Sequence, residues 1–208
     1  MYAWKARQAD VDLLTRACEF LSSHDAPSPC DLIFVLAGRP ERKPYGLELL
    51  RQKLSPRLIL SVGRFEVRDT AALLELPGLL SLRDNLPPRQ RHFWIDFHAS
   101  DFRNNAPQIT MAALQQANTF WELRGLASYL QSGRAVPHRI CIISTSIHLR
   151  RVRYCCAKIP FFARRSLAYL AVPEEQSSFQ KHGWWRRPAE STYLFREYLK
   201  LAGYRLLY

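Results

Sequence analysis

The segment Arg139-Ile140-Cys141-Ile142-Ile143-Ser144, followed at once by Thr145-Ser146-Ile147-His148-Leu149-Arg150-Arg151, decides the fold class. Its first half is a continuous apolar run, which is typical of a strand buried on both faces of a sheet. Its second half predicts a helix over about 147–158. A buried strand that leads directly into a helix indicates an α/β protein with a mostly parallel sheet.

The same alternation of strand and helix extends outward in both directions. Further strands are predicted at 32–36, 57–62, 93–97 and 167–172. Helices are predicted at about 10–22, 44–54, 70–76 and 190–202, with one of about twenty residues that begins near Gln108. The Leu-, Pro- and Arg-rich segment 77–91 is expected to leave the sheet. We therefore predict a Rossmann-like three-layer α/β fold with a mostly parallel sheet of about five strands.

The 208 residues, of which 48% are hydrophobic, suffice for one sizeable core. With no repeat or linker in view, we expect a single domain over 1–208, made of the first helix and a core at about 31–204. No apolar run reaches the roughly 18 residues of a membrane span, and the N-terminus lacks the features of a secretory signal. We expect a cytoplasmic protein without a transmembrane anchor.

The five cysteines show neither a CxxC pair nor the spacing of metal ligands. Cys155 and Cys156 are adjacent in a predicted helix, where their side chains diverge. We expect reduced thiols that serve as small apolar residues, and no metal site.

Thirty Lys and Arg residues against 18 Asp and Glu residues give a formal charge of +12. Such an excess attracts nucleic acid, an anionic membrane or a phosphorylated small molecule, and it does not choose among them. The Trp184-Trp185-Arg186-Arg187 segment is equally open: it suits a lid over a flat ligand, a nucleic-acid contact or a core anchor with solvated arginines.

Ligands of open parallel sheets bind beyond the carboxyl ends of the strands, where the strand order reverses. The residues that follow the predicted strands, or lead from them into helices, are Gly38, Arg39 and Arg42, Gly63 and Arg64, Asp96 to His98, Arg103, Asn104 and Asn105, Ser144, Thr145, Ser146, His148 and Arg151, and Pro173 to Glu175. We take the arginines, glycines, asparagines and hydroxyl residues among them as candidates for binding a small anion.

The group from Ser144 to Arg151 carries most of this hypothesis. Ser144, Thr145 and Ser146 place hydroxyls beside the free N–H groups of a helix start, which favours phosphate or carboxylate. His148 and Arg151 are three residues apart, so they share a helix face. We expect Arg151 to hold an oxyanion in a bidentate manner and His148 to be the catalytic residue, transferring a proton near neutral pH. The alternative is that the hydroxyls only cap the helix and that both side chains are ordinary surface groups.

Gly38 and the segment Arg103-Asn104-Asn105 are weaker indicators of a ligand-binding site. Gly38 permits close approach of a ligand to the backbone, or it simply makes a turn. Arg103, Asn104 and Asn105 are either ligand contacts or a polar loop. The chain has neither GxGxxG nor a Walker sequence, which disfavours a standard dinucleotide or P-loop site.

Several of these places resemble the YdcF-like family, the group that includes SanA and ElyC. The resemblance covers about 31–204 and rests on Val35-Leu36-Ala37-Gly38 with Arg42, on Ser61-Val62-Gly63, on Ser144 to Arg151, and on Phe195-Arg196-Glu197-Tyr198-Leu199-Lys200 with Tyr204. It implies a Rossmann-like fold and a pocket for a nucleotide-like ligand, for which S-adenosylmethionine has been proposed. Several relatives are anchored in the membrane and linked to the cell envelope.

The sequence also departs from the family pattern. The family opens its long central helix with Ser/Asn-Thr-x-Glu-Asn, and we align that element with 103–110, where no acidic residue occurs. The Ser-Gly-Gly that usually ends the second strand is reduced to a single Gly63. Both departures bear on whether the site is catalytic.

Three hypotheses follow. The first is an enzyme, a transferase or hydrolase, that acts on a phosphorylated or nucleotide-like small molecule, with His148 as the acid/base group. The second is a non-catalytic ligand-binding or partner protein that lost the acidic residue. The third is a nucleic-acid-binding protein, motivated by the charge.

Overall fold

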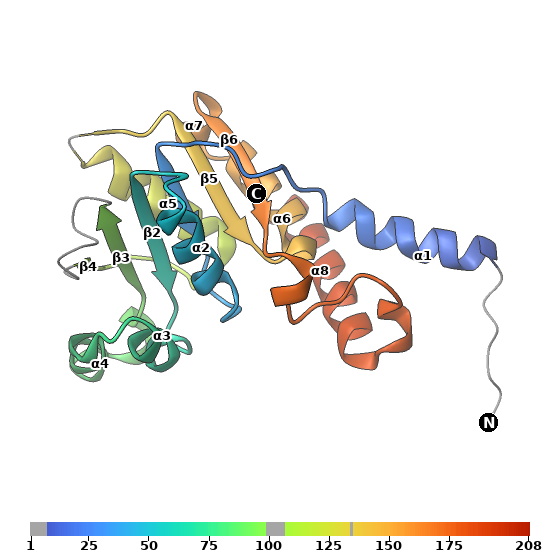
Figure 1. Cartoon of the computed structure of the whole chain (residues 1–208), viewed down its shortest axis with the longest axis horizontal. Helices are drawn as coiled ribbons and strands as arrows, with labels where there is room; N and C mark the ends of the chain where they lie inside the picture. Colours follow the sequence, from blue (N-terminus) through green and yellow to red (C-terminus); the bar gives the residue numbers. More distant parts are fainter. Residues whose placement is uncertain (1–7, 99–106, 134) are drawn as a thin grey trace.

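The computed structural model describes residues 8–98, 107–133 and 135–208. A six-stranded sheet in the order β4-β3-β2-β1-β5-β6 forms its centre (Figure 1). The strands are β1 (Leu32–Val35), β2 (Arg57–Val62), β3 (Phe93–His98), β4 (Gln108–Met111), β5 (Arg139–Ser144) and β6 (Ser166–Ala171). The neighbours β2, β1, β5 and β6 are parallel. The predicted Rossmann-like α/β fold with a mostly parallel sheet is therefore confirmed, with six strands in place of about five.

Eight α-helices lie in the described part of the chain. They are α1 (Gln8–Leu21), α2 (Arg42–Arg51), α3 (Val67–Leu73), α4 (Pro77–Asp84), α5 (Thr119–Gln131), α6 (Leu149–Ala157), α7 (Pro160–Ala163) and α8 (Pro188–Leu207), joined by the short 3-10 turns η1 (Pro88–Gln90), η3 (Ser146–His148), η4 (Glu174–Gln176) and η5 (Trp184–Arg186). None of the described helices is long and apolar enough to cross a membrane.

The two faces of the sheet bury two separate apolar clusters. Leu32 and Phe34 of β1 face one cluster, with side chains of α5 and α6, whereas Ile33 and Val35 face the other, with side chains of α2. This alternation follows from the two-residue period of a strand, and full burial of all four residues explains why β1 reads as an unbroken apolar run.

Strand β3 runs opposite to its neighbours, which corrects the expected position of Asp96 to His98. Helices α3 and α4 pack against each other at the ends of β2 and β3 (Figure 1). Because the chain stays at this edge and does not cross back over the sheet, β3 enters from the carboxyl edge and pairs antiparallel with β2. The Asp96 carboxylate consequently lies at the opposite edge, where it forms an ion pair with Arg57.

The prediction of a helix that begins near Gln108 is wrong. Residues 108–111 form β4, which pairs antiparallel with β3 as an edge strand, and the helix begins only at Thr119. Asn118 caps it, because its side chain accepts a hydrogen bond from the Trp121 backbone N–H at 3.1 Å. The shift moves the start of α5 to the carboxyl edge of the sheet.

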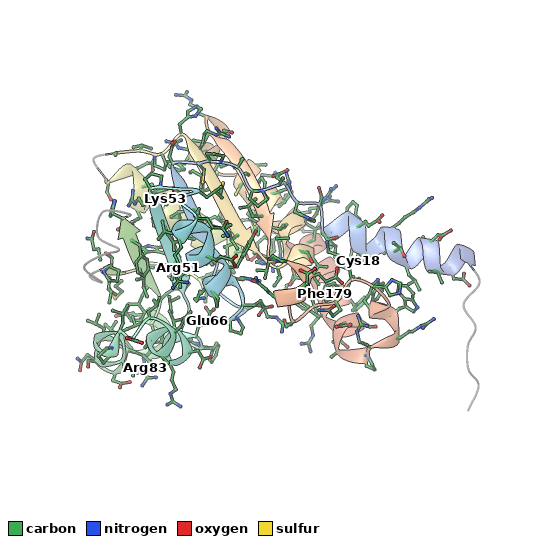
Figure 2. All side chains as sticks on the ribbon, viewed as in Figure 1. Cys18, Arg51, Lys53, Glu66, Arg83 and Phe179 are labelled. Atoms are coloured by element: carbon green, nitrogen blue, oxygen red, sulfur yellow. The ribbon has the colours of Figure 1, made fainter. Side chains whose placement is uncertain are left out.

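A third apolar cluster joins α1 to α8. Cys18 and Phe179 are both buried in it and lie near the junction of the two helices (Figure 2). Trp184 belongs to the same cluster, and its indole Nε1–H donates to the Leu14 carbonyl at 3.2 Å. Of the three interpretations left open for this segment, the structure supports a core anchor for Trp184.

Helix α2 packs very closely on β1 at Gly46, where an added Cβ atom would lie 2.4 Å from Val35 Cγ2. We predict that Gly46→Ala lowers the free energy of unfolding by ~1–3 kcal/mol, because overpacking outweighs the better helix propensity of alanine. Gly203→Ala in α8 is the control, since an added Cβ there meets nothing within 4 Å. This control should raise the free energy of unfolding by up to ~1 kcal/mol. Urea denaturation measures both, and equal stability of the two variants would contradict the close packing.

Candidate functional site at the carboxyl ends of the strands

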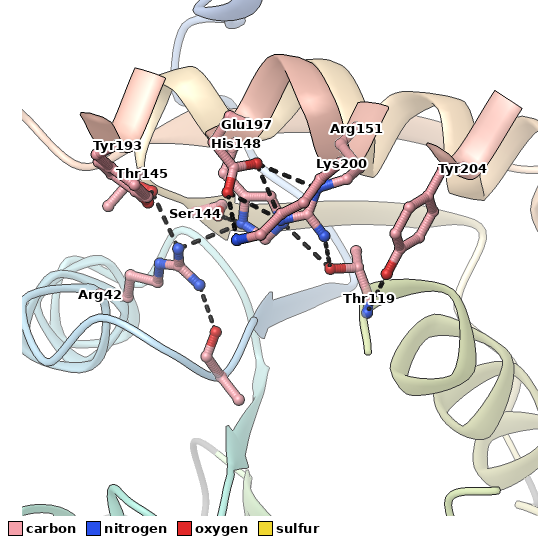
Figure 3. A network of polar contacts seen from close by, with 11 residues as sticks. Arg42, Thr119, Ser144, Thr145, His148, Arg151, Tyr193, Glu197, Lys200 and Tyr204 are labelled. Atoms are coloured by element: carbon pink, nitrogen blue, oxygen red, sulfur yellow. Dashed lines mark hydrogen bonds and ion pairs between the residues drawn. The ribbon is translucent and has the colours of Figure 1, made fainter. Parts of the chain in front are cut away.

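The strand order changes direction at β1, which lies between β2 and β5. The carboxyl ends of these strands, together with the first turns of α2 and α5, surround a cluster of polar side chains (Figure 3). In folds of this class the switch point is where a ligand binds. The cluster contains residues predicted from the sequence and others that the sequence did not reveal.

Arg42 opens α2 and reaches across to the residues that follow β5. Its Nη2 donates to Thr145 Oγ1 at 3.0 Å and to His148 Nδ1 at 3.2 Å, and its Nη1 donates to the Ala37 carbonyl (Figure 3). Gly38 has φ +124°, and an added Cβ there would lie 3.1 Å from Arg42 Nη1. A glycine is therefore needed for both the backbone conformation and the space that the guanidinium occupies.

Arg42 is buried without an ion-pair partner. The residue is 2% exposed, it forms no ion pair with any described residue, and its buried Nε has no hydrogen-bond partner. Neutral oxygen and nitrogen atoms satisfy part of its hydrogen-bonding capacity, and its charge also interacts with the buried Glu122 carboxyl, to which it forms neither an ion pair nor a hydrogen bond. A buried cation that lacks an ion-pair partner is energetically costly, so an anion placed beside it gains a large electrostatic attraction.

His148 is held as a neutral ring between three partners. Arg42 Nη2 can only donate, so His148 Nδ1 must accept, and it also accepts from the Ser144 hydroxyl at 2.7 Å. The opposite ring atom, Nε2, then carries the proton and donates to Thr119 Oγ1 at 3.2 Å. Burial, followed by the charges of Arg151, Arg42 and Lys200, holds the pKa of His148 well below its usual value. This finding corrects the expectation that His148 exchanges a proton near neutral pH.

Arg151 uses its whole guanidinium within the protein. Its Nε and Nη2 donate to Glu197 of α8 at distances down to 2.9 Å, and its Nη1 donates to Thr119 (Figure 3). The Tyr204 ring lies under it, with the centroid at 5.1 Å from Cζ. The predicted bidentate contact therefore exists, but its carboxylate belongs to Glu197. In this arrangement Arg151 ties α6 to α8 and positions Thr119 and, through it, His148.

Glu122 is a buried acidic residue in the first turn of α5. It follows Thr119 by three residues, and its Oε1 accepts the Ala37 backbone N–H at the end of β1 at 2.8 Å. Burial is the main reason why the pKa of Glu122 rises to about 7, and the nearby Glu66 raises it further. Because α5 begins at Thr119 and not near Gln108, this carboxyl lies at the opening of the helix.

A second buried ion pair lies next to Arg42. Lys43 is 2% exposed, and its Nζ lies 2.5 Å from Glu66 Oε1, while Glu66 Oε2 accepts the Gly63 backbone N–H at 3.0 Å. Burial lowers the pKa of Lys43, although Glu66 opposes this shift. The pair fixes the loop after β2 against the start of α2.

His92 enters this region because β3 is reversed. It directly precedes β3 at the carboxyl edge, and its Nε2 lies 2.7 Å from the Ser61 hydroxyl of β2. Burial and the charge of Lys43 lower the pKa of His92 to about 4, so the ring is neutral at physiological pH. The sequence offered no partner for this histidine, because its partner depends on the direction of β3.

The predicted binding residues separate into three groups. Arg42, Ser144, Thr145, His148 and Arg151 come together in one network. Gly38, Gly63 and Arg39 lie at its more exposed rim, where the Arg39 guanidinium stacks on Tyr193 at 4.4 Å, and the buried Ser146 begins η3. Arg103, Asn104 and Asn105 lie outside the described residues.

Two signals in the sequence pointed to the residues that we missed. Asn118 followed by an apolar helical run is a capping signal that places the start of α5, and with it Glu122, correctly. The β-branched pair Ile109-Thr110 favours a strand over a helix. Lys43 and Glu66 carry no comparable signal, since only their tertiary contact distinguishes them from surface charges.

The described residues contain no group of three or more His, Cys, Asp or Glu side chains that could hold a metal ion. Arg42, with the rim formed by Gly38 and Gly63, is the part of the site suited to an anionic ligand or cofactor. Comparison of the chain with family models, with curated proteins and with solved structures gives no match. The fold and the geometry of this site therefore define the protein as a Rossmann-like α/β protein with a charged cluster at the switch point.

The raised pKa of Glu122 predicts a pH-dependent stability. The folded state holds this proton up to about pH 7, against a usual value of 4.5, so the contribution to stability is present at low pH and is lost as the pH rises between these values. Glu122→Gln should therefore gain stability relative to the unsubstituted protein, by up to ~3 kcal/mol between pH 5 and pH 8. Denaturant titrations at both pH values measure this difference. Glu175→Gln, at an exposed glutamate, is the control. If the pH dependence of the free energy of unfolding were the same in Glu122→Gln and Glu175→Gln, the raised pKa of Glu122 would be refuted.

The Arg151–Glu197 pair should be important for stability. Glu197→Gln leaves the Arg151 guanidinium buried beside a neutral amide, which we expect to lower the free energy of unfolding by ~3 kcal/mol. In the Arg83–Asp84 pair the Asp84 side chain is 61% exposed, and Asp84→Asn should cost at most ~1 kcal/mol. Thermal and urea unfolding of the two variants compare the pairs directly, and similar losses in both would contradict a special role for Glu197.

Proposed function

We propose that this protein binds a small anionic ligand, phosphorylated or nucleotide-like, at the carboxyl ends of β1, β2 and β5, and acts on it as an enzyme of the transferase or hydrolase type. The observation that carries the proposal is the buried guanidinium of Arg42, which has no carboxylate partner among the described residues and an unpartnered Nε. An anion is the ligand that compensates such a charge.

The two other buried cations of the cluster explain why Arg42 is singled out. Lys43 is compensated by Glu66, and Arg151 is compensated by Glu197. These ion pairs are complete without a ligand. We therefore assign them to the stability of the site and not to ligand binding. Only Arg42 retains an unmet charge, and it lies beside the rim formed by Gly38.

The rim of the site suits the approach of a ligand. Gly38 is exposed and Gly63 is half-buried, and neither has a side chain that would block the way. Arg39 and Arg64 flank them and raise the positive potential in front of the switch point. Part of the formal charge of +12 is thereby placed where an anion enters.

Glu122 is the group that we assign to proton transfer. Its pKa of about 7 means that both the protonated and the ionised forms are populated near neutral pH, which is what general acid/base catalysis requires. The lowered pKa of His148 makes that ring a neutral acceptor that orients Arg42. His148 thereby becomes a positioning residue in the proposed mechanism.

The resemblance to the YdcF-like family agrees with this proposal. Arg42, Thr145 and His148, on which the resemblance partly rests, bond to one another, and Glu197 and Tyr204 hold Arg151 beside them. Asn118-Thr119 with Glu122 is similar to the acidic helix-opening pattern, with one additional residue between threonine and glutamate and with Leu123 in place of the final asparagine. S-adenosylmethionine and nucleotides are therefore included among the ligands to test.

The test measures the melting temperature with inorganic phosphate, AMP, a sugar phosphate and S-adenosylmethionine. A ligand present at a hundred times its dissociation constant adds about 2.7 kcal/mol, which raises the melting temperature of a chain of this size by roughly 5–10 °C. We expect Arg42→Met to abolish this shift and Arg42→Lys, which keeps the charge without the planar fork, to retain part of it.

Arg68→Met is the matched control, because Arg68 is an exposed arginine of α3 that forms no hydrogen bond or ion pair with the residues of the cluster, and it should keep the full shift. Circular dichroism confirms that each variant is folded. A full shift in Arg42→Met would overturn the assignment of the anion site. Binding without turnover of any ligand would overturn the enzymatic part and leave the binding function. Turnover that survives Glu122→Gln would overturn the assignment of proton transfer to Glu122.

A further inference from the structure

A groove of about 430 Å³ lies between helix α5 and the β3–β4 edge of the sheet. Its walls include Trp94, Met111, Trp121, Arg124, Ser128 and Tyr129. None of these residues takes part in the charged cluster around Arg42. The volume falls within the roughly 300–1,000 Å³ of small-molecule sites.

Aromatic rings form much of the wall. The rings of Trp94 and Tyr129 are neighbours, with centroids 6.5 Å apart, and Trp121 lines the groove from the first turn of α5. Gly125 of α5 lies against Leu114 and Trp94, because an added Cβ would lie 2.6 Å from Leu114 Cδ2 and 3.5 Å from Trp94 Cζ2. The missing side chain at this position lets the helix come close to these two residues.

A cation also lines the groove. The guanidinium of the exposed Arg124 lies 4.8 Å from the centroid of the Trp121 ring, and Arg124 forms no ion pair with the described residues. This positive charge favours a negatively charged group on a ligand that occupies the groove.

We propose that this groove is a second binding site, separate from the switch point, for a flat aromatic carboxylate of one or two fused rings. The ring system lies against the aromatic side chains of the groove, where aromatic stacking favours it, and the carboxylate pairs with the guanidinium of Arg124. Trp121 and Glu122 are consecutive in α5, but Trp121 lines the groove while Glu122 bonds to the end of β1.

Isothermal titration calorimetry with 2-naphthoate tests the site, with neutral 2-naphthamide as the matched ligand. The unsubstituted protein should bind the acid about five- to tenfold more tightly than the amide. Arg124→Gln should remove this preference, and Trp121→Phe, which keeps a ring but a smaller one, should weaken the binding of both ligands. Arg68→Gln is the control for loss of a surface charge and should change neither affinity.

The Arg42→Met variant tests whether naphthoate binding in the groove is independent of the proposed anion site at the switch point. Naphthoate affinity that persists in Arg42→Met supports a second site, whether or not phosphate or nucleotides bind at the switch point. The proposal is overturned if naphthoate does not bind saturably, if Arg124→Gln keeps the preference for the acid, or if Arg42→Met alone abolishes binding. Arg124 is exposed, so its substitution leaves the fold intact, and circular dichroism verifies this.

Discussion

The structure depends on the burial of three cations at one edge of the sheet. Arg42, Lys43 and Arg151 are each less than a tenth exposed, and a buried charge is tolerated only where other groups compensate it. Glu66 and Glu197 do so for two of them. These pairs link the loop after β2 to α2, and α6 to α8, so the charges that line the switch point also hold its walls together.

The third cation, Arg42, differs from the other two because it has no carboxylate in an ion pair with it. An ion pair that is complete within the protein has little left to offer a ligand, whereas Arg42 keeps a charge that its neutral partners do not cancel. The His148 ring beside Arg42 is neutral, because protonation would add a second buried positive charge next to the guanidinium. The same low-polarity surroundings raise the pKa of Glu122 to about 7.

Two departures from a regular α/β repeat bring residues into the site. Helices α3 and α4 remain at the carboxyl edge, so β3 reverses and His92 faces Ser61. The outermost strand β4 then runs antiparallel to β3 and returns the chain to the carboxyl ends of the parallel strands. Helix α5 therefore starts there, and Glu122 reaches the end of β1. The groove lined by aromatic residues lies between α5 and the neighbouring strands β3 and β4.

The sequence by itself determined the strands β1, β2, β5 and β6 and the helices that follow them, because each strand is a largely apolar run. A glycine or a hydroxyl residue marks the ends of β1, β2 and β5. It also placed Arg42, Ser144, Thr145 and His148 near one another, since parallel strands end at the same edge. Only the tertiary structure decided the direction of β3 and the pairing of Lys43 with Glu66 and of Arg151 with Glu197. These features arise from contacts between residues far apart in the chain, and local periodicity does not encode which buried charge meets which.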